Sequence, residues 1–278
     1  MQERTLAATA GIKGKEAPVL VARPRPGVAA LTLNRAAARN SLSLTMIDAL
    51  HLAVVELGKE AGIAAIVLAA DGPVFCAGHD LKELTAHRAD ADGGHAFFAD
   101  TMTRCSAMMQ AIVACPKPVI AAVQGTATAA GCQLVATCDL AVAAEASQFC
   151  TPGVNIGLFC STPMVALSRN VGRKRAMEML LLGEMLPATK AAEYGLVNRV
   201  VPQEKLLPEA LALAAKIAEK SPTVVALGKA AFYAQAEMPL KEAYAYASKV
   251  MTQNMMARDA AEGIGAFLEK RKPEWKGC

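Results

Sequence analysis

The chain has 278 residues and a formal net charge of +4, with 54% hydrophobic and only 4% aromatic residues. This length accommodates one large domain or two small ones, and the apolar content argues against disorder. It is typical of a helix-rich α/β protein with an aliphatic core. Lys and Arg are scattered and form no basic stripe with aromatic platforms, so we expect no nucleic-acid partner. The mild positive charge favours an anionic small molecule.

The cysteines show neither a C-x-x-C pair nor the Cys/His spacing of a metal site, so we expect no metal. They are Cys76, Cys105, Cys115, Cys132, Cys138, Cys150, Cys160 and Cys278. Most lie in apolar segments, which predicts reduced thiols in a core. No apolar run is long enough for a bilayer, and residues 1–16 lack the apolar region of a secretory signal. We expect a cytoplasmic protein without a membrane partner, with the mitochondrial matrix as the alternative in a eukaryote.

In chain order, the first predicted elements follow a loose tail at residues 1–17. Val19–Arg23 and Val28–Asn34 are typical of two strands joined by a Pro- and Gly-containing turn. A polar loop then reaches Ser43, which we expect to cap a helix over Leu44–Lys59, because the apolar residues of that segment follow helical spacing.

The middle of the chain alternates between strands and helices. Ile63–Ala70 is a continuous apolar run, which predicts a strand buried on both faces. Residues 85–95 are rich in Ala, Asp, Gly and His, and we expect them to be mobile; a helix over Phe97–Ala114 follows. Val119–Gln124 is a second buried strand, and Val197–Val201 is an expected edge strand. Strands that alternate with helices predict parallel pairing with helical crossovers.

The last part of the chain, Gln203–Lys270, is predicted to be all helical. Its helices should break near Pro222, near Pro239 and at Met256–Arg258. This region is either a separate layer or an arm for self-association.

Two glycine turns each follow a buried strand and precede an expected helix: Cys76–Asp80 and Ala129–Cys132. The second opens the stretch Gly125–Gly153, in which a small-residue turn leads into an apolar helix whose N-terminus suits a partly negative oxygen. Donor N–H groups from two such turns form an oxyanion hole for a carbonyl that becomes an anion. Spacing alone leaves the alternative of two ordinary tight turns open.

Three segments carry a resemblance to a known family. Leu33–Ser43 resembles the LNRP-x-x-x-NAL loop of the enoyl-CoA hydratase/isomerase (crotonase) family, and Phe75–Lys82 resembles its F-x-AG-x-DL-K segment. Lys117–Asp139 resembles its KP-x-IAAV-x-G…GGG-x-EL…CD segment. The likeness continues through Ala188–Val201 and Glu262–Pro273, so it covers nearly the whole chain in the right order.

This resemblance implies an α/β fold of the crotonase, ClpP-like kind. In that fold ββα units form a spiral with two roughly perpendicular sheets. We expect the spiral core over residues 18–202 and a helical trimerisation region over residues 203–278. The resemblance further implies self-association to a trimer or a dimer of trimers.

The same resemblance implies acyl-CoA as the ligand, with no cofactor besides the coenzyme A thioester itself. By position, the N–H groups of His79 and Ala130 would hold the thioester oxygen. The expected lining of the ligand groove consists of Ala38, Arg39, Ala77, Gly78, Asp80, Leu81, Lys82, Gly131, Phe267 and Lys270.

The chain departs from the family at both acid–base positions. A hydratase of this family carries one glutamate before the L of G-x-EL and another in a later PE pair; Gln133 and Gly153 stand there instead. Hydration needs one carboxylate to activate water and another to supply a proton, and neither residue can exchange a proton near neutral pH. Standard hydration of enoyl-CoA is therefore not expected. Family isomerases commonly use the second carboxylate, which is missing too.

Several residues are candidates for replacing these groups. His79 is a general base, a CoA contact or a solvated turn histidine, and Asp80 is expected to bind amides of its own turn. Cys132 and Cys150 are nucleophiles or, more simply, core thiols, while Asp139 is expected to be a hydrogen-bonded structural acid. The remaining candidates are Asn155 and Ser161 for the acyl pocket, and Glu83, Asp90 and Asp92 through loop closure.

Two functions remain open. The first is an acyl-CoA enzyme with a non-standard base, acting in hydrolysis, decarboxylation or isomerisation. The second is a non-catalytic protein that binds acyl-CoA as a regulator or carrier. A ClpP-like serine peptidase is excluded, because no Ser/His/Asp set accompanies the turns.

Overall fold

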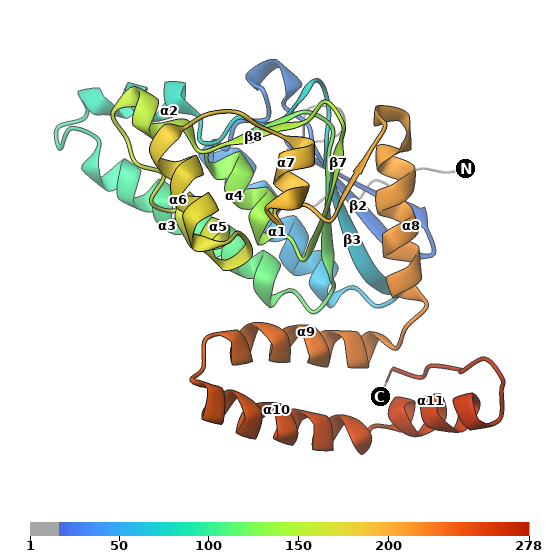
Figure 1. Ribbon diagram of the computed structural model, residues 1–278. Helices are drawn as coiled ribbons and strands as arrows, with labels where there is room; N and C mark the ends of the chain where they lie inside the picture. Colours follow the sequence, from blue (N-terminus) through green and yellow to red (C-terminus); the bar gives the residue numbers. More distant parts are fainter. Residues whose placement is uncertain (1–16, 278) are drawn as a thin grey trace.

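The computed structural model describes residues 17–277 (Figure 1). The tail expected at residues 1–17 lies, apart from Ala17, outside the described residues. The strands are β1 (Val19–Arg25), β2 (Gly27–Leu33), β3 (Ile63–Ala70), β4 (Val74–Cys76), β5 (Val119–Val123), β6 (Thr126–Thr128), β7 (Leu140–Ala144), β8 (Gln148–Cys150), β9 (Leu186–Pro187) and β10 (Arg199–Val201). The helices are α1 (Leu44–Lys59), α2 (Leu81–Ala86), α3 (His95–Ala114), α4 (Ala130–Thr137), α5 (Pro163–Asn170), α6 (Arg173–Leu182), α7 (Ala188–Glu193), α8 (Leu206–Ala218), α9 (Pro222–Ala236), α10 (Leu240–Met255) and α11 (Arg258–Leu268).

The strands form two sheets in the pattern that ββα units produce. The larger sheet has the order β1-β2-β3-β5-β7-β10, and the smaller has the order β4-β6-β8-β9. Each of the pairs β3/β4, β5/β6 and β7/β8 gives its first strand to the larger sheet and its second to the smaller one. The β1–β2 hairpin is antiparallel, whereas pairing from β2 across to β10 is parallel throughout. The predicted hairpin, parallel pairing and edge strand are thus confirmed.

Helix α1 has the bounds and the cap that its sequence predicts. The Oγ atom of Ser43 accepts a hydrogen bond from the N–H of Met46 (3.3 Å), which satisfies a free donor of the first turn. The buried residues of α1 recur at helical spacing and face the core. This amphipathic face fixes the helix against β1 and α3.

Helices cover both faces of the larger sheet. Along β3, Ile66 and Leu68 enter the main core with α1, α3 and α4, while Ala65 and Val67 face the other way into a smaller core. Helix α8 closes that smaller core, and Figure 1 shows it on the opposite side of the sheet from α1. Burial on both faces explains the uninterrupted apolar run in this strand.

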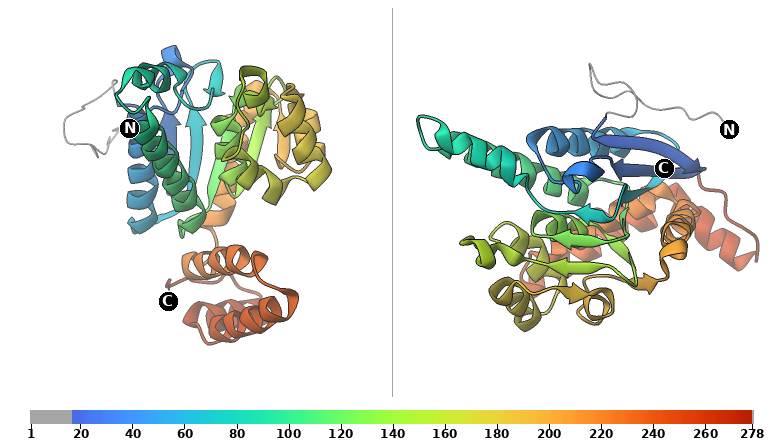
Figure 2. Two further views of the ribbon diagram at one scale, coloured as in Figure 1. Left: turned by 90° about the vertical axis from the view of Figure 1, so that its left-hand side faces the viewer. Right: turned by 90° about the horizontal axis from the view of Figure 1, so that it is seen from above.

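Helices α9, α10 and α11 form a layer of their own beyond the end of the sheets, as Figures 1 and 2 show. The predicted breaks near Pro222, near Pro239 and between Met256 and Arg258 are confirmed by the bounds of these helices. Helix α8 packs on the larger sheet, so the separate C-terminal layer begins with α9 and not with α8. A domain boundary at residue 203 stays a prediction.

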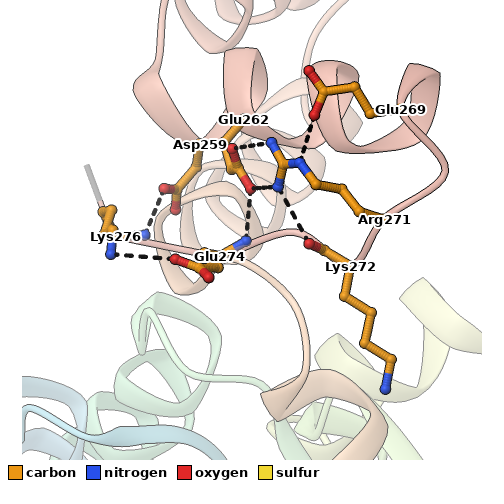
Figure 3. Close-up of polar contacts among 7 residues, drawn as sticks. All are labelled: Asp259, Glu262, Glu269, Arg271, Lys272, Glu274 and Lys276. Carbon is orange, nitrogen blue, oxygen red and sulfur yellow. Dashed lines mark hydrogen bonds and ion pairs between the residues drawn. The ribbon is translucent and has the colours of Figure 1, made fainter.

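The segment after α11 folds back onto this C-terminal layer. Figure 3 shows Arg271 between Glu262 and Glu269, at 2.6 Å from a carboxylate oxygen of each. The buried carboxylate of Asp259 accepts hydrogen bonds from the backbone N–H of Lys276 (2.8 Å) and from that of Gly277. These contacts fix residues 269–277 as a strap on α11.

Residues 85–95 contain more regular structure than expected. Helix α2 runs to Ala86 and is followed by a 3-10 helix at His87–Ala89, and α3 begins at His95 rather than at Phe97. The imidazole of His87 stacks on the ring of Phe97, with ring centroids 3.5 Å apart. The mobility of this segment stays a prediction.

None of the helices within residues 17–277 combines the length and the apolar character that a membrane span requires.

Candidate functional site

The two glycine turns lie against each other. Strands β4 and β6 pair in parallel, with Cys76 opposite Ala127. The turns that follow these two strands therefore begin at the same end of the smaller sheet. Gly78 has a φ of +87°, and a Cβ atom there would lie 3.3 Å from the backbone nitrogen of Ala130. A Cβ atom on Gly131 would lie 2.1 Å from the carbonyl oxygen of Cys76, so this contact requires glycine.

Each turn presents a backbone N–H group without an acceptor among residues 17–277: those of His79 and Ala130. Ala130 is the first residue of α4, so its N–H has no intrahelical acceptor. The neighbouring N–H groups are engaged, since Asp80 donates to Leu42 (3.2 Å) and Ala129 donates to Cys150 (2.9 Å). Free donors therefore occur on both turns, at the place where the turns meet.

Ala129 holds the second turn in a conformation that normally belongs to glycine. Its φ is 49° and its ψ is −118°, a region in which a Cβ atom causes strain. Its hydrogen bond to Cys150 keeps it there. This backbone conformation turns the chain so that α4 begins directly beside Gly78.

The polar loop before α1 is bound to the first turn. The buried side chain of Asn40 donates from Nδ2 to the carbonyl oxygens of Asp71 and Val74, both at 2.8 Å. The carbonyl oxygen of Arg39 accepts from the N–H of Ala77 (3.1 Å). These bonds place Ala38 and Arg39 beside the Ala77–Gly78 turn, as the groove prediction requires. The role of Asn40 was missed, although an asparagine in a polar loop was a signal for such a bond.

Asp80 has the local role expected for it. Its Oδ1 accepts from the backbone N–H groups of Lys82 (3.2 Å) and Glu83 (3.3 Å), so it caps α2. Its Oδ2 accepts from the hydroxyl of Ser41 (3.1 Å). Leu81 and Lys82 lie exposed on the first turn of α2.

Three buried side-chain atoms around the turns have no hydrogen-bond partner within residues 17–277. They are Nε2 of His79, Oε1 of Gln133 and Oγ1 of Thr151. Burial lowers the pKa of His79, so its ring is neutral near pH 7. His79 is half-buried and its Nε2 atom is shielded, which favours the alternatives of a base or a CoA contact over a solvated turn histidine; its role stays a prediction. Thr151 was missed as a site residue because a lone threonine after a strand carries no specific signal.

Gly153 is enclosed by the segment that follows it. A Cβ atom there would lie 3.0 Å from both the carbonyl oxygen of Leu158 and the Sγ atom of Cys160. The N–H of Leu158 donates to the carbonyl oxygen of Gly153 (2.9 Å), which closes the loop over this position. No space remains for a longer side chain without a shift of this loop.

A scan against family models matches residues 24–278 to the enoyl-CoA hydratase/isomerase model. The chain belongs to the enoyl-CoA hydratase/isomerase family. It is 47% identical to mouse enoyl-CoA hydratase domain-containing protein 3, mitochondrial, over 96% of this chain and 88% of that protein. The human protein of that name is also 47% identical, over 96% of this chain and 87% of its own length.

Solved structures show the crotonase α/β fold with C-terminal helices. A Mycobacterium smegmatis enoyl-CoA hydratase superposes with a TM-score of 0.88 at 51% identity, covering 94% of this chain and 99% of that one. Human enoyl-CoA hydratase domain-containing protein 3 superposes with a TM-score of 0.88 at 47% identity, covering 93% and 100%.

In this family member the cysteines are core residues. The seven described ones are free and buried, and Cys278 lies outside the described residues. Burial raises the pKa of the Cys150 thiol to about 11 and also raises that of Cys132, so both are protonated near neutral pH. A nucleophilic thiolate at either position is not supported.

Asp139 is the structural acid that its apolar surroundings predict. Its carboxylate accepts hydrogen bonds from the N–H of Val119 (2.7 Å), the ammonium of Lys229 (2.7 Å) and the hydroxyl of Tyr233 (2.9 Å). These contacts join β5 and β7 to α9.

The remaining candidates lie apart from the turns or have local partners. Phe267 and Lys270 are exposed at the end of α11, which Figure 1 shows in the separate C-terminal layer. Asn155 donates to the carbonyl oxygen of Gly183 (3.3 Å), and the exposed Ser161 donates to that of Phe159. The acidic candidates are engaged locally: Glu83 with Leu44, Asp90 with His87, and Asp92 with Gly94 and Ala96.

Proposed function

We propose that this protein binds acyl-CoA and holds the thioester oxygen between the N–H groups of His79 and Ala130. The observation that carries the proposal is that the two turns lie against each other and that each presents such a donor without an acceptor among residues 17–277. An anion or polarised carbonyl is the partner that such a pair suits. The groove lining proposed on the body of the chain is Ala38, Arg39, Ala77, Gly78, Asp80, Leu81, Lys82 and Gly131.

We further propose that the protein does not hydrate enoyl-CoA through two carboxylates. Gln133 and the enclosed Gly153 occupy the two acid–base positions of the family pattern, and neither transfers a proton near neutral pH. His79 lies within the first turn, and its buried Nε2 has no hydrogen-bond partner within residues 17–277, which favours it as the base of any turnover. The alternative is binding without turnover, as a regulator or carrier.

Self-association belongs to the same proposal. Helices α9, α10 and α11 expose large apolar side chains, among them Phe232, Leu240, Tyr244, Met256 and Phe267. Such a surface is typical of a protein–protein interface, and a trimer or dimer of trimers would cover it. Because α11 lies away from the turns of its own chain, Phe267 and Lys270 would contact CoA at the site of another copy. Light scattering after gel filtration tests the assembly.

The free, buried cysteines fit a compartment that keeps thiols reduced, so we keep the proposal of a cytoplasmic or mitochondrial matrix location.

Isothermal calorimetry with butyryl-CoA and infrared spectroscopy of its ¹³C-labelled carbonyl test the binding mode. We expect saturable binding and a carbonyl stretch at lower frequency than in water, because two donors polarise the bond. Gly78→Ala should abolish the shift, since a Cβ there strains the turn and meets Ala129. The matched control is Gly62→Ala, with a similar φ of +85° but no atom within 4 Å of the new Cβ.

Absence of acyl-CoA binding, or an unshifted carbonyl in the wild-type complex, would overturn the proposed binding mode. Crotonyl-CoA assayed in parallel addresses the chemistry. A hydration rate comparable to that of a two-glutamate relative would contradict the conclusion drawn from Gln133 and Gly153.

A further inference from the structure

The backbone N–H of His79 owes its direction to the polar loop before α1. Leu42, in that loop, and His79 form an isolated parallel bridge. The N–H of Leu42 donates to the carbonyl oxygen of Gly78 (2.8 Å), and its carbonyl oxygen accepts from the N–H of Asp80 (3.2 Å). In parallel pairing these two bonds flank the opposite residue, whose own N–H then faces the other side. The bridge therefore turns the N–H of His79 away from the loop.

The guanidinium of Arg35 holds both chains of this bridge. Its Nη1 donates to the Oγ atom of Ser43 (2.6 Å), the residue that follows Leu42. Its Nη2 lies 3.6 Å from Oδ2 of Asp80, the residue that follows His79. Because a guanidinium is planar and its donors have fixed directions, it sets the spacing of two partners more closely than an ammonium does.

Asp80 carries this constraint to the backbone of the first glycine turn. Its Oδ1 caps α2, while its Oδ2 faces the guanidinium of Arg35 and accepts from the hydroxyl of Ser41 (3.1 Å). A carboxylate held by several donors fixes the residue that bears it, and the N–H of that residue is the one that donates to Leu42. Loss of the guanidinium would therefore loosen the bridge at Leu42 and His79.

We infer that Arg35 is a positioning residue, which acts through Asp80 and Ser43 to hold the N–H of His79 in the direction that binds a thioester oxygen. This inference rests on the proposed acyl-CoA binding. A donor of this kind works by being preorganised, so its direction decides its strength. Loosening the bridge should weaken the hold on the thioester oxygen and leave the contacts with the rest of CoA unchanged.

The test compares butyryl-CoA with free CoA, which has no thioester carbonyl, by calorimetry on the full chain. Arg35→Met should weaken the binding of butyryl-CoA about fivefold, since one hydrogen bond is worth roughly that factor, and should leave the binding of CoA unchanged. In infrared spectra the ¹³C-labelled carbonyl should move back towards its frequency in water. A role in stability alone would not move this frequency in the folded, ligand-bound protein.

The matched control is Arg23→Met, which removes another arginine–carboxylate pair from the other end of α1. Arg23 pairs with Glu60, and its side chain is 28% exposed, against 34% for Arg35. This variant should change neither the ratio of the two dissociation constants nor the carbonyl frequency. Arg35→Lys keeps the charge beside Asp80 but not the fork, so its losses should be smaller than those of Arg35→Met. Circular dichroism checks folding, and Arg35→Lys decides the question where Arg35→Met is unfolded.

A double-mutant cycle shows whether Arg35 acts through Asp80. Asp80→Asn should also weaken the binding of butyryl-CoA relative to CoA, because its neutral amide no longer pairs with the guanidinium. The double variant Arg35→Met/Asp80→Asn should lose no more than Asp80→Asn alone, since the two residues belong to one contact. Fully additive losses would overturn the proposed route through Asp80.

The outcomes separate this inference from the proposed function. If the wild type does not bind butyryl-CoA, the proposed function fails and the inference fails with it. If the wild type binds butyryl-CoA with a shifted carbonyl, and the folded Arg35 variants change neither the ratio nor the frequency, acyl-CoA binding stands and the positioning role is wrong. Equal weakening of CoA and butyryl-CoA would mean that Arg35 contacts the CoA part directly, which also overturns the inference.

Discussion

The ammonium of Lys229 lies 2.7 Å from Oδ2 of Asp139, and this nearly inaccessible ion pair joins the C-terminal layer to the sheet. The ammonium also donates to the carbonyl oxygens of Ile112 (3.0 Å) and Lys117 (3.3 Å), so its three hydrogens are all used. Asp139 follows the helix that begins at Ala130. The same helix therefore has the proposed thioester site at one end and the attachment of α9 at the other.

Lys229→Met should destabilise the protein strongly. The methionine preserves most of the packing but leaves Asp139 and two carbonyl groups without their cation, and breaking a buried pair in this way costs about 3–5 kcal/mol. Urea unfolding followed by circular dichroism measures the loss. Lys190→Met, which removes the exposed pair with Glu193, is the control and should change little. Equal effects of the two substitutions would show that the buried pair has no special role.

Ala129→Gly should stabilise the protein. The backbone strain at φ 49° and ψ −118° costs about 1–3 kcal/mol, whereas glycine adds only about 0.5–1 kcal/mol of lost chain entropy. We expect a net gain of about 1 kcal/mol in the free energy of unfolding, measured by denaturant titration. Ala136→Gly, inside the same helix, should instead lose about 1 kcal/mol. A loss at both positions would mean that the turn at residue 129 is not strained.

Gly153→Ala should cost about 1–3 kcal/mol, because the new Cβ overpacks against the enclosing loop. Gly172→Ala is the control: its φ of −54° suits alanine, and no atom lies within 4 Å of the new Cβ. For the same steric reason, Gly153→Glu combined with Gln133→Glu should not produce hydratase activity. Efficient hydration of crotonyl-CoA by that double variant would show that the loop opens readily.

The pH dependence of stability should report on His79. Its folded-state pKa lies below the ordinary 6.5, so the unfolded chain binds a proton at a higher pH than the folded chain does. The free energy of unfolding should therefore fall as the pH drops from about 6.5 through the folded-state pKa. His79→Asn should flatten this decline relative to the wild type in urea titrations at about pH 7.5 and about pH 5.5. Parallel declines in the two proteins would contradict the burial of the neutral ring.

The sequence predicted those parts of the fold that depend on local signals. The helix Leu44–Lys59 was predicted with its bounds because a capping serine and regular apolar spacing lie within one segment. The two-sided burial of β3 followed from its unbroken apolar run. The prediction that the two glycine turns act together came from the family resemblance. Their spacing alone was equally compatible with two unrelated tight turns.

Other features depend on contacts between distant segments and leave no local mark. The loop over Gly153 exists because residues 158–160 return to it, and nothing in the Pro-Gly pair indicates this. The hydroxyl of Thr151 is buried without a partner within residues 17–277 only because distant segments pack around it. Lys229 is the exception, since a single lysine in an apolar helical segment is a local signal for a buried acidic partner.

The strap at residues 269–277 has a consequence for how the chain matures. Asp259 binds the hydroxyl of Ser221 (2.6 Å) and the amides of Lys276 and Gly277, and Trp275 donates to the carbonyl oxygen of Glu219 (2.8 Å). The junction between α8 and α9 is thus completed by residues 275–277, which are synthesised well after the junction itself. The C-terminal layer can therefore close only after the ribosome has produced these residues, even though α9 and α10 are made earlier.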